Sequence, residues 1–472
     1  MSNDIDVTSR IVAFCVLERV RRDGSFANLL LPAELRTRQV HSRDAAFATD
    51  LTYGCLRWLG LCDSVISAAA KRPCSKIDPA VLDVLRLGVY QWLFMAVPAY
   101  AVVSSSMTVA RREKLTRQSG FVNAVLRVVT ARRRQEWEAL VVSRIPKEDR
   151  YERLAVRYSH PRWIVERLDR SLQAAAAADP SLAKITLEQV LSADNQAPAV
   201  TVAVRPGLVT PKEILSQIPY RAKGESGLWS PFALRLKGVD PGSLPAVHTG
   251  VAGVEDEGSQ LTALTAAMAP LPGLGTEKRW LDLCAGPGGK TAMLAAVARQ
   301  RNIVVQANEP VPRRAQLVRD AVRALTDTVS TITERDGRDY NPSRDGLFDR
   351  VLVDVPCSGL GALRRRPEAR WTKRESDIAD LASVQKELLT VATLLVRPGG
   401  LVAYVTCSPV LEETRAIVDA VLAADPSVRR LDAAAAMRVA APKVPVASTG
   451  DVQLLSAPHD TDMMFVSLLT RN

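Results

Sequence analysis

The chain has 472 residues, 47% of them hydrophobic and 24% charged, so it is long enough for two to four folded domains and too apolar for a disordered protein. Its net charge of +11 and isoelectric point near 9.5 favour a polyanionic partner. Seven cysteines without CxxC or Cys/His zinc spacing, no signal sequence and no apolar run of about 18 residues indicate a reducing cytoplasm, without a membrane partner or a metal site.

Residues 1–145 are expected to form an all-helical domain. Apolar residues recur at helical spacing in three stretches, Ile11–Val20, Asp44–Leu59 and Ala80–Met95. Residues 1–150 hold 23 Lys and Arg against 15 Asp and Glu, including the run Arg132–Arg134. A basic helical bundle suits RNA binding, and an ordinary solvated face is the alternative interpretation of these arginines.

Residues 146–243 are expected to begin with helices and to continue as a small α+β subdomain. Pro161 marks a helix start within Tyr158–Leu168. Ala197–Arg205 alternates like a strand, Thr210–Glu213 opens a short helix, and Leu228–Leu236 is strand-like again. The sequence leaves open whether this subdomain docks a substrate or is a packing spacer.

Residues 244–472 alternate strands with helices, which predicts an α/β domain with a doubly wound parallel sheet. Its clearest unit is Trp280–Thr291 (WLDLCAGPGGKT), a buried strand, a turn of small residues and the start of a helix. Such a turn offers main-chain N–H groups at a positive helix end to a nucleotide-like ligand. The Walker A and dinucleotide patterns each fail by one residue, because Cys284 and Thr291 stand where glycine is needed.

Polar residues follow the other strands expected in this domain. The strands are predicted at 303–307, 331–333, 350–354 and 400–406, and the residues at or just beyond their ends are Glu309, Asp336, Asp354, Cys357 and Cys407. Because the carboxyl ends of parallel strands meet at one edge of a sheet, these side chains are expected to surround one ligand site. Cys357 and Cys407 are then neighbours in space, and two small buried hydrophobes are the alternative interpretation.

Several motifs resemble those of one enzyme family. Asp354–Gly359 (DVPCSG) resembles the DAPCSG motif of RNA cytosine-5 methyltransferases, and Thr406–Ser408 resembles their TCS motif. Cys284–Lys290 (CAGPGGK) is similar to their S-adenosylmethionine loop, and Glu255–Leu261 to their QDxSSQL segment. The phrases RDAAFATDLTYGCLR and GFVNAVLR resemble the NusB-like helical RNA-binding fold. Over nearly its whole length the chain therefore resembles the RsmB/Sun (Fmu) family of 16S ribosomal RNA cytosine-5 methyltransferases.

The resemblance implies a NusB-like RNA-binding domain at 1–145, a helical linker with a small α+β subdomain at 146–243, and a Rossmann-like methyltransferase domain at 244–472. It implies that Cys407 adds to carbon 6 of a cytosine and that Cys357 assists breakdown of the adduct. It further implies that Asp354, with a raised pKa, holds or protonates the base near N3. The residues expected to bind S-adenosylmethionine are Cys284, Ala285, Gly286, Pro287, Gly288, Gly289, Lys290, Glu309, Asp336 and Asp354. The expected partner is 16S ribosomal RNA, bound by a monomer, with no DNA partner.

Three details depart from the family pattern. Glu309 stands where the family more often has Asp, Gly286 replaces the second Ala of the loop, and Pro458–Phe465 lacks the usual glycine. After the DVPCSG motif, the arginines of 364–370 and Trp371 are interpreted either as RNA contacts or as a structural Trp with a solvated basic rim.

Three other functions remain open on the sequence alone. A DNA cytosine-5 methyltransferase would use Cys357 as its nucleophile, and a methyltransferase acting on transfer RNA would share most of the motifs. An RNA-binding assembly or antitermination factor with an inactive methyltransferase fold would need neither cysteine. The intact loop and the two cysteine motifs argue against the last of these.

Overall fold

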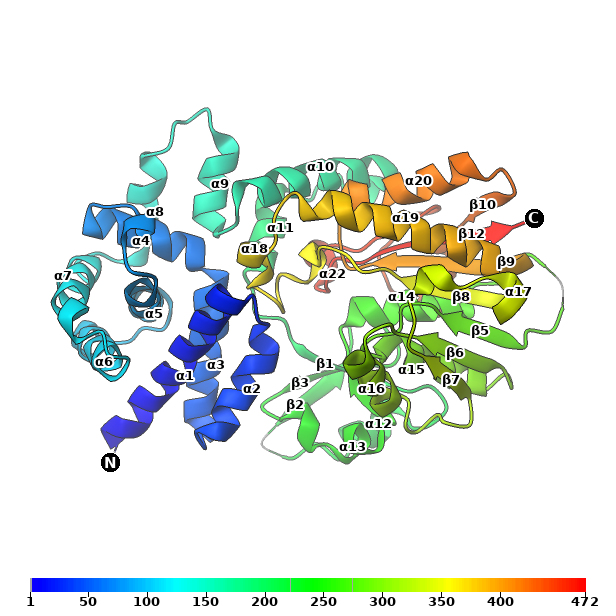
Figure 1. The fold of residues 1–472 in the computed structure, drawn as a ribbon, viewed down its shortest axis with the longest axis horizontal. Coiled ribbons are helices and arrows are strands. Elements are labelled where there is room, and N and C mark those ends of the chain that lie inside the picture. Colours follow the sequence, from blue (N-terminus) through cyan, green and yellow to red (C-terminus); the bar gives the residue numbers. More distant parts are fainter. Residues whose placement is uncertain (1, 221, 274) are drawn as a thin grey trace. The chain divides into compact units, whose positions relative to one another are not determined.

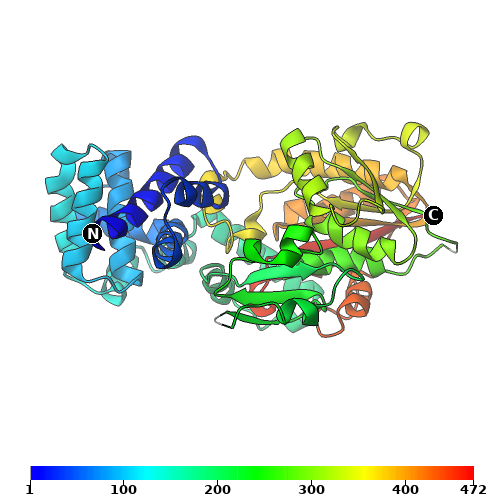
Figure 2. The same cartoon turned by 90° about the horizontal axis from the view of Figure 1, so that it is seen from below.

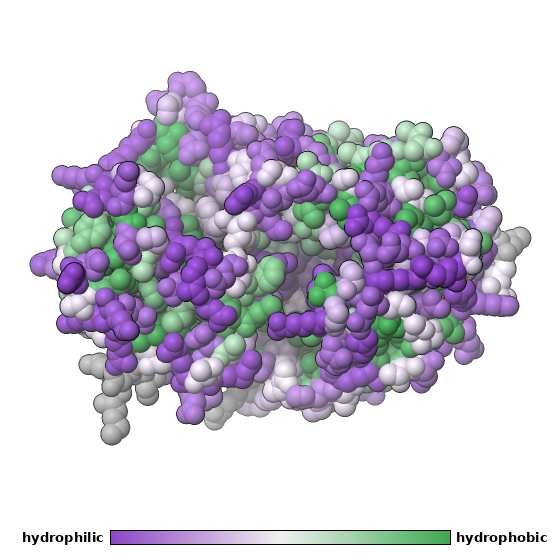
Figure 3. Space-filling view, in the orientation of Figure 1, coloured by the Kyte–Doolittle hydropathy of each residue, from purple (hydrophilic) through white to green (hydrophobic). Residues whose placement is uncertain are grey.

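The computed structural model describes residues 2–220, 222–273 and 275–472, and they form two compact units. The helical unit contains Met1–Arg167, Asp194–Gln196 and Leu363–Arg374, and the α/β unit contains Leu168–Ala193, Ala197–Ala362 and Glu375–Asn472. No helix among the described residues is both long and apolar enough to cross a membrane. Hydrophilic side chains are spread over both units on the face drawn in Figure 3. The domain boundaries expected at 145 and 243 stay a prediction.

The helical unit is all-α, as the periodicity predicts (Figure 1). Its helices are α1 (Ser2–Asp23), α2 (Ala27–Thr37), α3 (Ser42–Arg57), α4 (Leu59–Ala70), α5 (Pro79–Phe94), α6 (Ala99–Arg112), α7 (Ser119–Val129), α8 (Arg134–Ser143), α9 (Arg150–Tyr158) and the short α18 (Ala369–Thr372). α5 begins where Asp78 accepts hydrogen bonds from the main-chain N–H groups of Ala80 and Val81. It is buried over most of its length, so the other helices pack around it.

The α/β unit contains a small antiparallel sheet in the strand order β2-β3-β1-β4. Its strands and short helices are β1 (Val200–Val204), α12 (Pro211–Leu215), β2 (Lys223–Ser226), β3 (Ala233–Lys237), α13 (Pro245–Thr249) and β4 (Ala252–Val254). Val202 and Leu234 lie opposite each other and are fully buried in its core. The expected α+β character is confirmed, although both predicted strands are shorter than the sequence pattern indicated, because β1 begins at Val200 and β3 at Ala233.

The large sheet has the strand order β10-β12-β9-β8-β5-β6-β7, with β11 paired to β12. Its strands are β5 (Arg279–Asp282), β6 (Val304–Asn308), β7 (Val329–Thr333), β8 (Phe348–Asp354), β9 (Val396–Thr406), β10 (Val428–Leu431), β11 (Val452–Gln453) and β12 (Phe465–Arg471). The neighbouring strands β7, β6, β5, β8 and β9 are parallel, as predicted. β12, however, pairs antiparallel with β9 and with β10. The sheet is therefore mixed and not wholly parallel.

Helices cover both faces of this sheet (Figures 1 and 2). They are α14 (Glu257–Met268), α15 (Gly289–Arg299), α16 (Pro312–Ala321), α19 (Asp377–Leu395), α20 (Arg415–Ala424) and α21 (Ala433–Ala440). The remaining helices are α10 (Arg162–Ala178), α11 (Leu187–Asp194), α17 (Pro342–Asp345) and α22 (Ser456–His459). Alternate residues of each strand face opposite sides. Leu352 and Ala403 therefore pack under α14, α15 and α21, whereas Val351 and Tyr404 pack under α19 and α20. The two layers fix the edge at which β5 to β9 end.

Candidate active site

The turn between β5 and α15 is shaped for close approach to the main chain. Gly288 has φ +104°, a left-handed conformation that favours glycine, and α15 begins at the next residue. A Cβ atom on Gly286 would lie 2.2 Å from Oε2 of Glu309. The helix start therefore presents main-chain N–H groups beside a carboxylate, which suits a ligand with both polar and anionic groups.

Asp282, the last residue of β5, is fully buried. Thr291 Oγ1 donates a 2.7 Å hydrogen bond to its Oδ2, whereas its Oδ1 makes no hydrogen bond of normal geometry among the described residues. Burial raises the pKa of Asp282 to about 7, an effect that the Thr291 hydrogen bond opposes. Asp282 was not among the residues expected at the site, although an acid that ends an otherwise apolar strand is a usable signal.

The ends of β6 and β7 carry the two other expected carboxylates. Glu309 is buried, accepts a hydrogen bond from the Val311 N–H at 3.0 Å and lies 3.4 Å from the half-exposed Arg314. Asp336 is more exposed, and Arg338 holds both of its oxygens, which lowers the pKa of Asp336. Both acids lie at the predicted edge, but each is paired with an arginine close to it in the chain.

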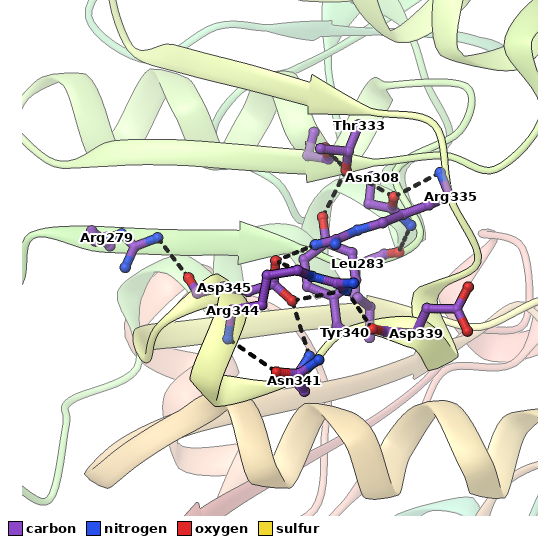
Figure 4. Close-up of polar contacts among 11 residues, drawn as sticks. Arg279, Leu283, Asn308, Thr333, Arg335, Asp339, Tyr340, Asn341, Arg344 and Asp345 are labelled. Atoms are coloured by element: carbon purple, nitrogen blue, oxygen red, sulfur yellow. Dashed lines mark hydrogen bonds and ion pairs between the residues drawn. The ribbon is translucent and has the colours of Figure 1, made fainter.

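Buried Asn308 joins the turn after β5 to the end of β7, as Figure 4 shows. Its Nδ2 donates to the Leu283 carbonyl at 3.1 Å, and its Oδ1 accepts a 2.8 Å hydrogen bond from Thr333 Oγ1. Tyr340 OH lies 2.7 Å from the same hydroxyl, and the Arg335 guanidinium lies 3.6 Å from the centre of the Tyr340 ring. The amide thus fixes the carbonyl that immediately precedes Cys284.

The two cysteine motifs meet at the ends of β8 and β9. Cys357 Sγ and Cys407 Sγ are 3.3 Å apart, which confirms that the two residues are neighbours. The main chains are joined as well, because Gly361 N–H donates to the Cys407 carbonyl at 2.9 Å. The sulfur contact lowers the pKa of Cys357, because the Cys407 thiol can donate to a Cys357 thiolate. The same contact and burial raise the pKa of Cys407.

One ion pair links the turn after β5 to the end of β8. Lys290 Nζ donates to Asp354 Oδ2 at 2.7 Å, and both side chains are largely buried. Burial lowers the pKa of Lys290, but the Asp354 carboxylate more than offsets this, so the net shift is upward. The ammonium is also close enough to favour a thiolate at Cys407. Lys290 and Asp354 therefore form a charged connection between the glycine turn and the cysteines.

Arg364 and Arg370, which follow the DVPCSG motif, are structural and do not form an exposed basic rim. Arg370 is fully buried in the helical unit, where it donates to the carbonyls of Arg57, Ser159 and Asp194. Trp371 Nε1 donates to the Leu56 carbonyl at 2.7 Å. Arg364 is also buried. The interpretation of Arg364 and Arg370 as RNA contacts is therefore wrong, because both side chains are buried inside the unit, and the Nε1 hydrogen bond of Trp371 agrees with its structural interpretation.

Comparison with known proteins agrees with this arrangement. Residues 272–470 match the family described as 16S rRNA methyltransferase RsmB/F, and residues 7–131 match the NusB family. "Putative methyltransferase Rv1407" of Mycobacterium tuberculosis is 44% identical over 98% of this chain and 96% of its own length. "Ribosomal RNA small subunit methyltransferase B" of Erwinia tasmaniensis is 31% identical over 86% of this chain and 87% of its own length. The chain belongs to the RsmB/F family.

A solved structure shares the complete fold of this RsmB/F protein. It is titled "Crystal Structure of PH0851", superposes with a TM-score of 0.76 at 21% identity, and covers 99% of this chain and 98% of its own. The expected fold is confirmed, with a NusB-like helical region followed by an α/β methyltransferase domain. As an RsmB/F protein the chain is an S-adenosylmethionine-dependent methyltransferase, as the motifs predicted.

The residues at the ends of β5, β6 and β7 fit S-adenosylmethionine. The cofactor is cationic at its sulfonium and its amino group, and buried Asp282 offers Oδ1 without a hydrogen-bond partner among the described residues. Gly286 leaves space beside the main chain that a Cβ would fill. Glu309 is a buried acid at the end of the second parallel strand, where ribose hydroxyls are bound in such sheets.

Proposed function

We propose that this RsmB/F protein methylates carbon 5 of a cytosine in 16S ribosomal RNA through a covalent adduct between Cys407 and carbon 6. The observation that carries the proposal is the 3.3 Å contact between Cys357 Sγ and Cys407 Sγ at adjacent strand ends. Carbon 5 of cytosine is a poor nucleophile, and addition of a thiolate to carbon 6 makes it enamine-like. S-adenosylmethionine supplies the methyl group.

The sulfur pair supplies the proton transfer that the first step needs. The lowered pKa of Cys357 makes its thiolate available, and this thiolate can accept the proton of Cys407 across 3.3 Å as Cys407 Sγ bonds to carbon 6. After Cys357 has released that proton to solvent, its thiolate can take the proton of carbon 5. Loss of that proton restores the double bond between carbons 5 and 6 and breaks the bond to Cys407.

Asp354 and Lys290 act on the charge of the ring. Addition at carbon 6 pushes electrons toward N3 and the carbonyl oxygen, where a proton donor or a positive charge stabilises them. Asp354 ends β8 three residues before Cys357, with Lys290 Nζ 2.7 Å from its carboxylate. We propose that Asp354 binds the base near N3 and that Lys290 orients this carboxyl.

The remaining residues bind the cofactor in this proposal. The turn Cys284–Lys290 holds the methionine portion, Glu309 accepts the ribose hydroxyls, and Asp336 contacts the adenine. Arg314 and Arg338 then have to exchange these carboxylate contacts for others when the cofactor binds. Ribosomal RNA as substrate is supported by the name of the Erwinia tasmaniensis relative and by the basic helical unit.

The test uses RNA that contains 5-fluorocytosine, together with S-adenosylmethionine. Fluorine replaces the proton that must leave carbon 5, so the methylated adduct cannot break down and migrates with the RNA on a denaturing gel. Wild type and Cys357→Ala are expected to trap 16S ribosomal RNA, and Cys407→Ala is not. Cys15→Ala, a half-buried thiol of the helical unit, is the matched control and is expected to trap like wild type.

The lower pKa of Cys357 favours one alternative assignment, in which Cys357 is the nucleophile. Trapping by Cys407→Ala, with loss of trapping in Cys357→Ala, would establish that reversed assignment. If wild type binds the cofactor but forms no covalent complex with 16S ribosomal RNA, transfer RNA or DNA that contains 5-fluorocytosine, the proposed cytosine-5 chemistry is wrong for this chain.

A further inference from the structure

A buried carboxylate lies directly behind both cysteine motifs. Glu413 belongs to the 3-10 turn Leu411–Glu413 before α20, and its side chain is fully buried. Its Oε1 accepts a 2.7 Å hydrogen bond from the Ser358 N–H, and its Oε2 accepts hydrogen bonds from Ser358 Oγ at 2.5 Å and Ser408 Oγ at 2.6 Å. Ser358 follows Cys357 in the chain and Ser408 follows Cys407, so one carboxylate holds both motifs.

Neighbouring groups complete the connection. Gln385 of α19 donates to Glu413 Oε1 at 3.1 Å and to the Pro356 carbonyl at 2.9 Å. Tyr404 OH donates to the Glu413 main-chain carbonyl at 2.6 Å. The carboxylate is therefore fixed from the sheet and from α19 as well as from the two cysteine loops.

Such a group is expensive to bury. Transfer of a carboxylate from water into a protein interior is strongly unfavourable unless hydrogen bonds satisfy it, and hydrogen bonds to a charged acceptor are short and strong. The donors described above are uncharged, so no ion pair among them accounts for the acid at this position. Two apolar side chains could have packed the same space between α19 and the strand ends. What the carboxylate adds is a common acceptor for the residues that follow both cysteines.

We infer that Glu413 is a positioning residue that holds Cys357 Sγ and Cys407 Sγ in contact, and this inference rests on the proposed function. Glu413 touches neither sulfur, and it acts through Ser358 and Ser408. With the carboxylate in place, the two loops move together, and the proton of Cys407 has one defined acceptor. Without it, the sulfur separation varies, and an ångström of misplacement costs about 100-fold in rate.

The inference makes different predictions for two substitutions of the same residue. Glu413→Ala removes every acceptor and is expected to slow single-turnover methyl transfer by about 100-fold, with the dissociation constant for S-adenosylmethionine within about twofold of wild type. Glu413→Gln can accept from the Ser358 N–H through its oxygen and donate to both serine hydroxyls through its amide. It is expected to keep the rate within about tenfold of wild type. Glu412→Gln, an exposed neighbour paired with Arg170, is the matched control.

A double-mutant cycle separates positioning from general structural support. In a Ser358→Ala, Ser408→Ala background the hydroxyl donors are already lost, so adding Glu413→Ala is expected to cost much less than in wild type. Equal losses in both backgrounds would overturn the inference. So would a wild-type single-turnover rate in Glu413→Ala that remains folded by circular dichroism.

A thiol readout tests the inference without any RNA. Cys357 and Cys407 are alkylated with iodoacetamide over a range of pH, and the product at each position is quantified by mass spectrometry. The Cys407 contact is the main cause of the lowered Cys357 pKa, and the Glu413 charge opposes it. Glu413→Gln removes this charge but keeps the hydrogen bonds, so it is expected to move Cys357 alkylation to lower pH, and Glu412→Gln to leave it unchanged. Glu413→Ala also frees the two loops, so its Cys357 alkylation is expected at higher pH than in Glu413→Gln. Identical profiles in Glu413→Gln and Glu413→Ala contradict the inference even if no cytosine is ever methylated, whereas failed trapping with profiles that differ in this way contradicts only the proposed function.

Discussion

The two parts of the sheet edge are built differently. The cofactor edge, at the ends of β5, β6 and β7, is held by a glycine turn and by acids whose arginine partners are about half exposed, as in Glu309 with Arg314. The cysteine edge, at the ends of β8 and β9, is held by buried hydrogen bonds, including those of Glu413 and of Gly361.

This difference matches what the proposed function requires of each edge. A cofactor enters and leaves, so its carboxylates gain from partners that are solvated and easily exchanged, because exposed ion pairs contribute little stability. Two sulfurs that must pass a proton need one fixed separation, which buried hydrogen bonds to loop backbones provide. Changes at the cysteine edge are therefore expected to affect the chemical step, and changes at the cofactor edge are expected to affect cofactor affinity.

The largest effect is expected from Gly361→Ala. A Cβ at this position would lie 2.1 Å from the Met463 carbonyl oxygen and 2.7 Å from that of Cys407, and backbone cannot move aside as a side chain can. The expected result is a loss of at least about 100-fold in single-turnover rate with little change in cofactor affinity. Gly286→Ala is the counterpart, since its Cβ meets the movable end of Glu309 and should weaken cofactor binding only. Similar rate losses in both variants would contradict the comparison.

Lys290→Met breaks the ion pair that joins the two edges. The variant leaves Asp354, whose side chain is only 24% exposed, without its ammonium partner. Loss of one member of a largely buried pair is expected to lower the free energy of unfolding by about 2 kcal/mol. Urea unfolding measures this change, with Lys290→Arg as the control that retains a cation. A variant as stable as wild type would show that the pair is only incidental.

The affinity for S-adenosylmethionine is expected to depend on pH through Asp282. The pKa of this acid is raised to about 7, with burial as the main cause, so the carboxyl is mostly protonated at pH 6 and mostly ionised at pH 8. An ionised carboxylate favours a cationic ligand, so affinity should rise about tenfold between pH 6 and pH 8. Calorimetric titration measures it, and Asp282→Asn should bind with little dependence on pH.

The same group has the opposite effect on the stability of the cofactor-free protein. Because the folded pKa lies above that of the unfolded chain, the folded state keeps the proton longer, and stability should fall as pH rises from about 4 through 7. Thermal unfolding of wild type and Asp282→Asn across this range should converge at acid pH and diverge above it. Parallel curves would argue against the raised pKa.

The smallest effect is expected from Arg338→Ala. Arg338 and Asp336 are each 42% exposed, and pairs of this kind typically contribute less than about 1 kcal/mol. Thermal unfolding should therefore change little, and cofactor affinity by no more than about twofold. A large loss of affinity would show that Arg338 itself binds the cofactor.

The residues at the strand ends were predictable because parallel strands must bring their carboxyl ends to one edge. The proximity of Cys357 and Cys407 could therefore be predicted from the order of the strands alone, and the glycine turn could be predicted from its composition. The antiparallel β12 was not predicted, because a strand at the chain end carries no crossover pattern that fixes its direction. Glu413 was also missed, because nothing local to it distinguishes a buried acid from its exposed neighbour Glu412.

The burial of the arginines after the DVPCSG motif could not be predicted from the sequence, for a different reason. A run of basic residues gives no sign of what surrounds it, and here the surroundings come from chain positions far from 370. Asp282 was predictable in part. The strand that it ends was predicted, but the lack of a hydrogen-bond partner for its Oδ1 among the described residues was not.

The placement of Leu363–Arg374 has a consequence for dissecting this protein. The segment belongs to the helical unit, but parts of the α/β unit precede and follow it in the chain. No single cut can separate the two units, and a fragment that begins near residue 197 would carry Arg370 without the carbonyls of Arg57, Ser159 and Asp194. The protein is thus not modular in the usual sense, and swapping its helical unit between relatives requires exchanging this insert as well.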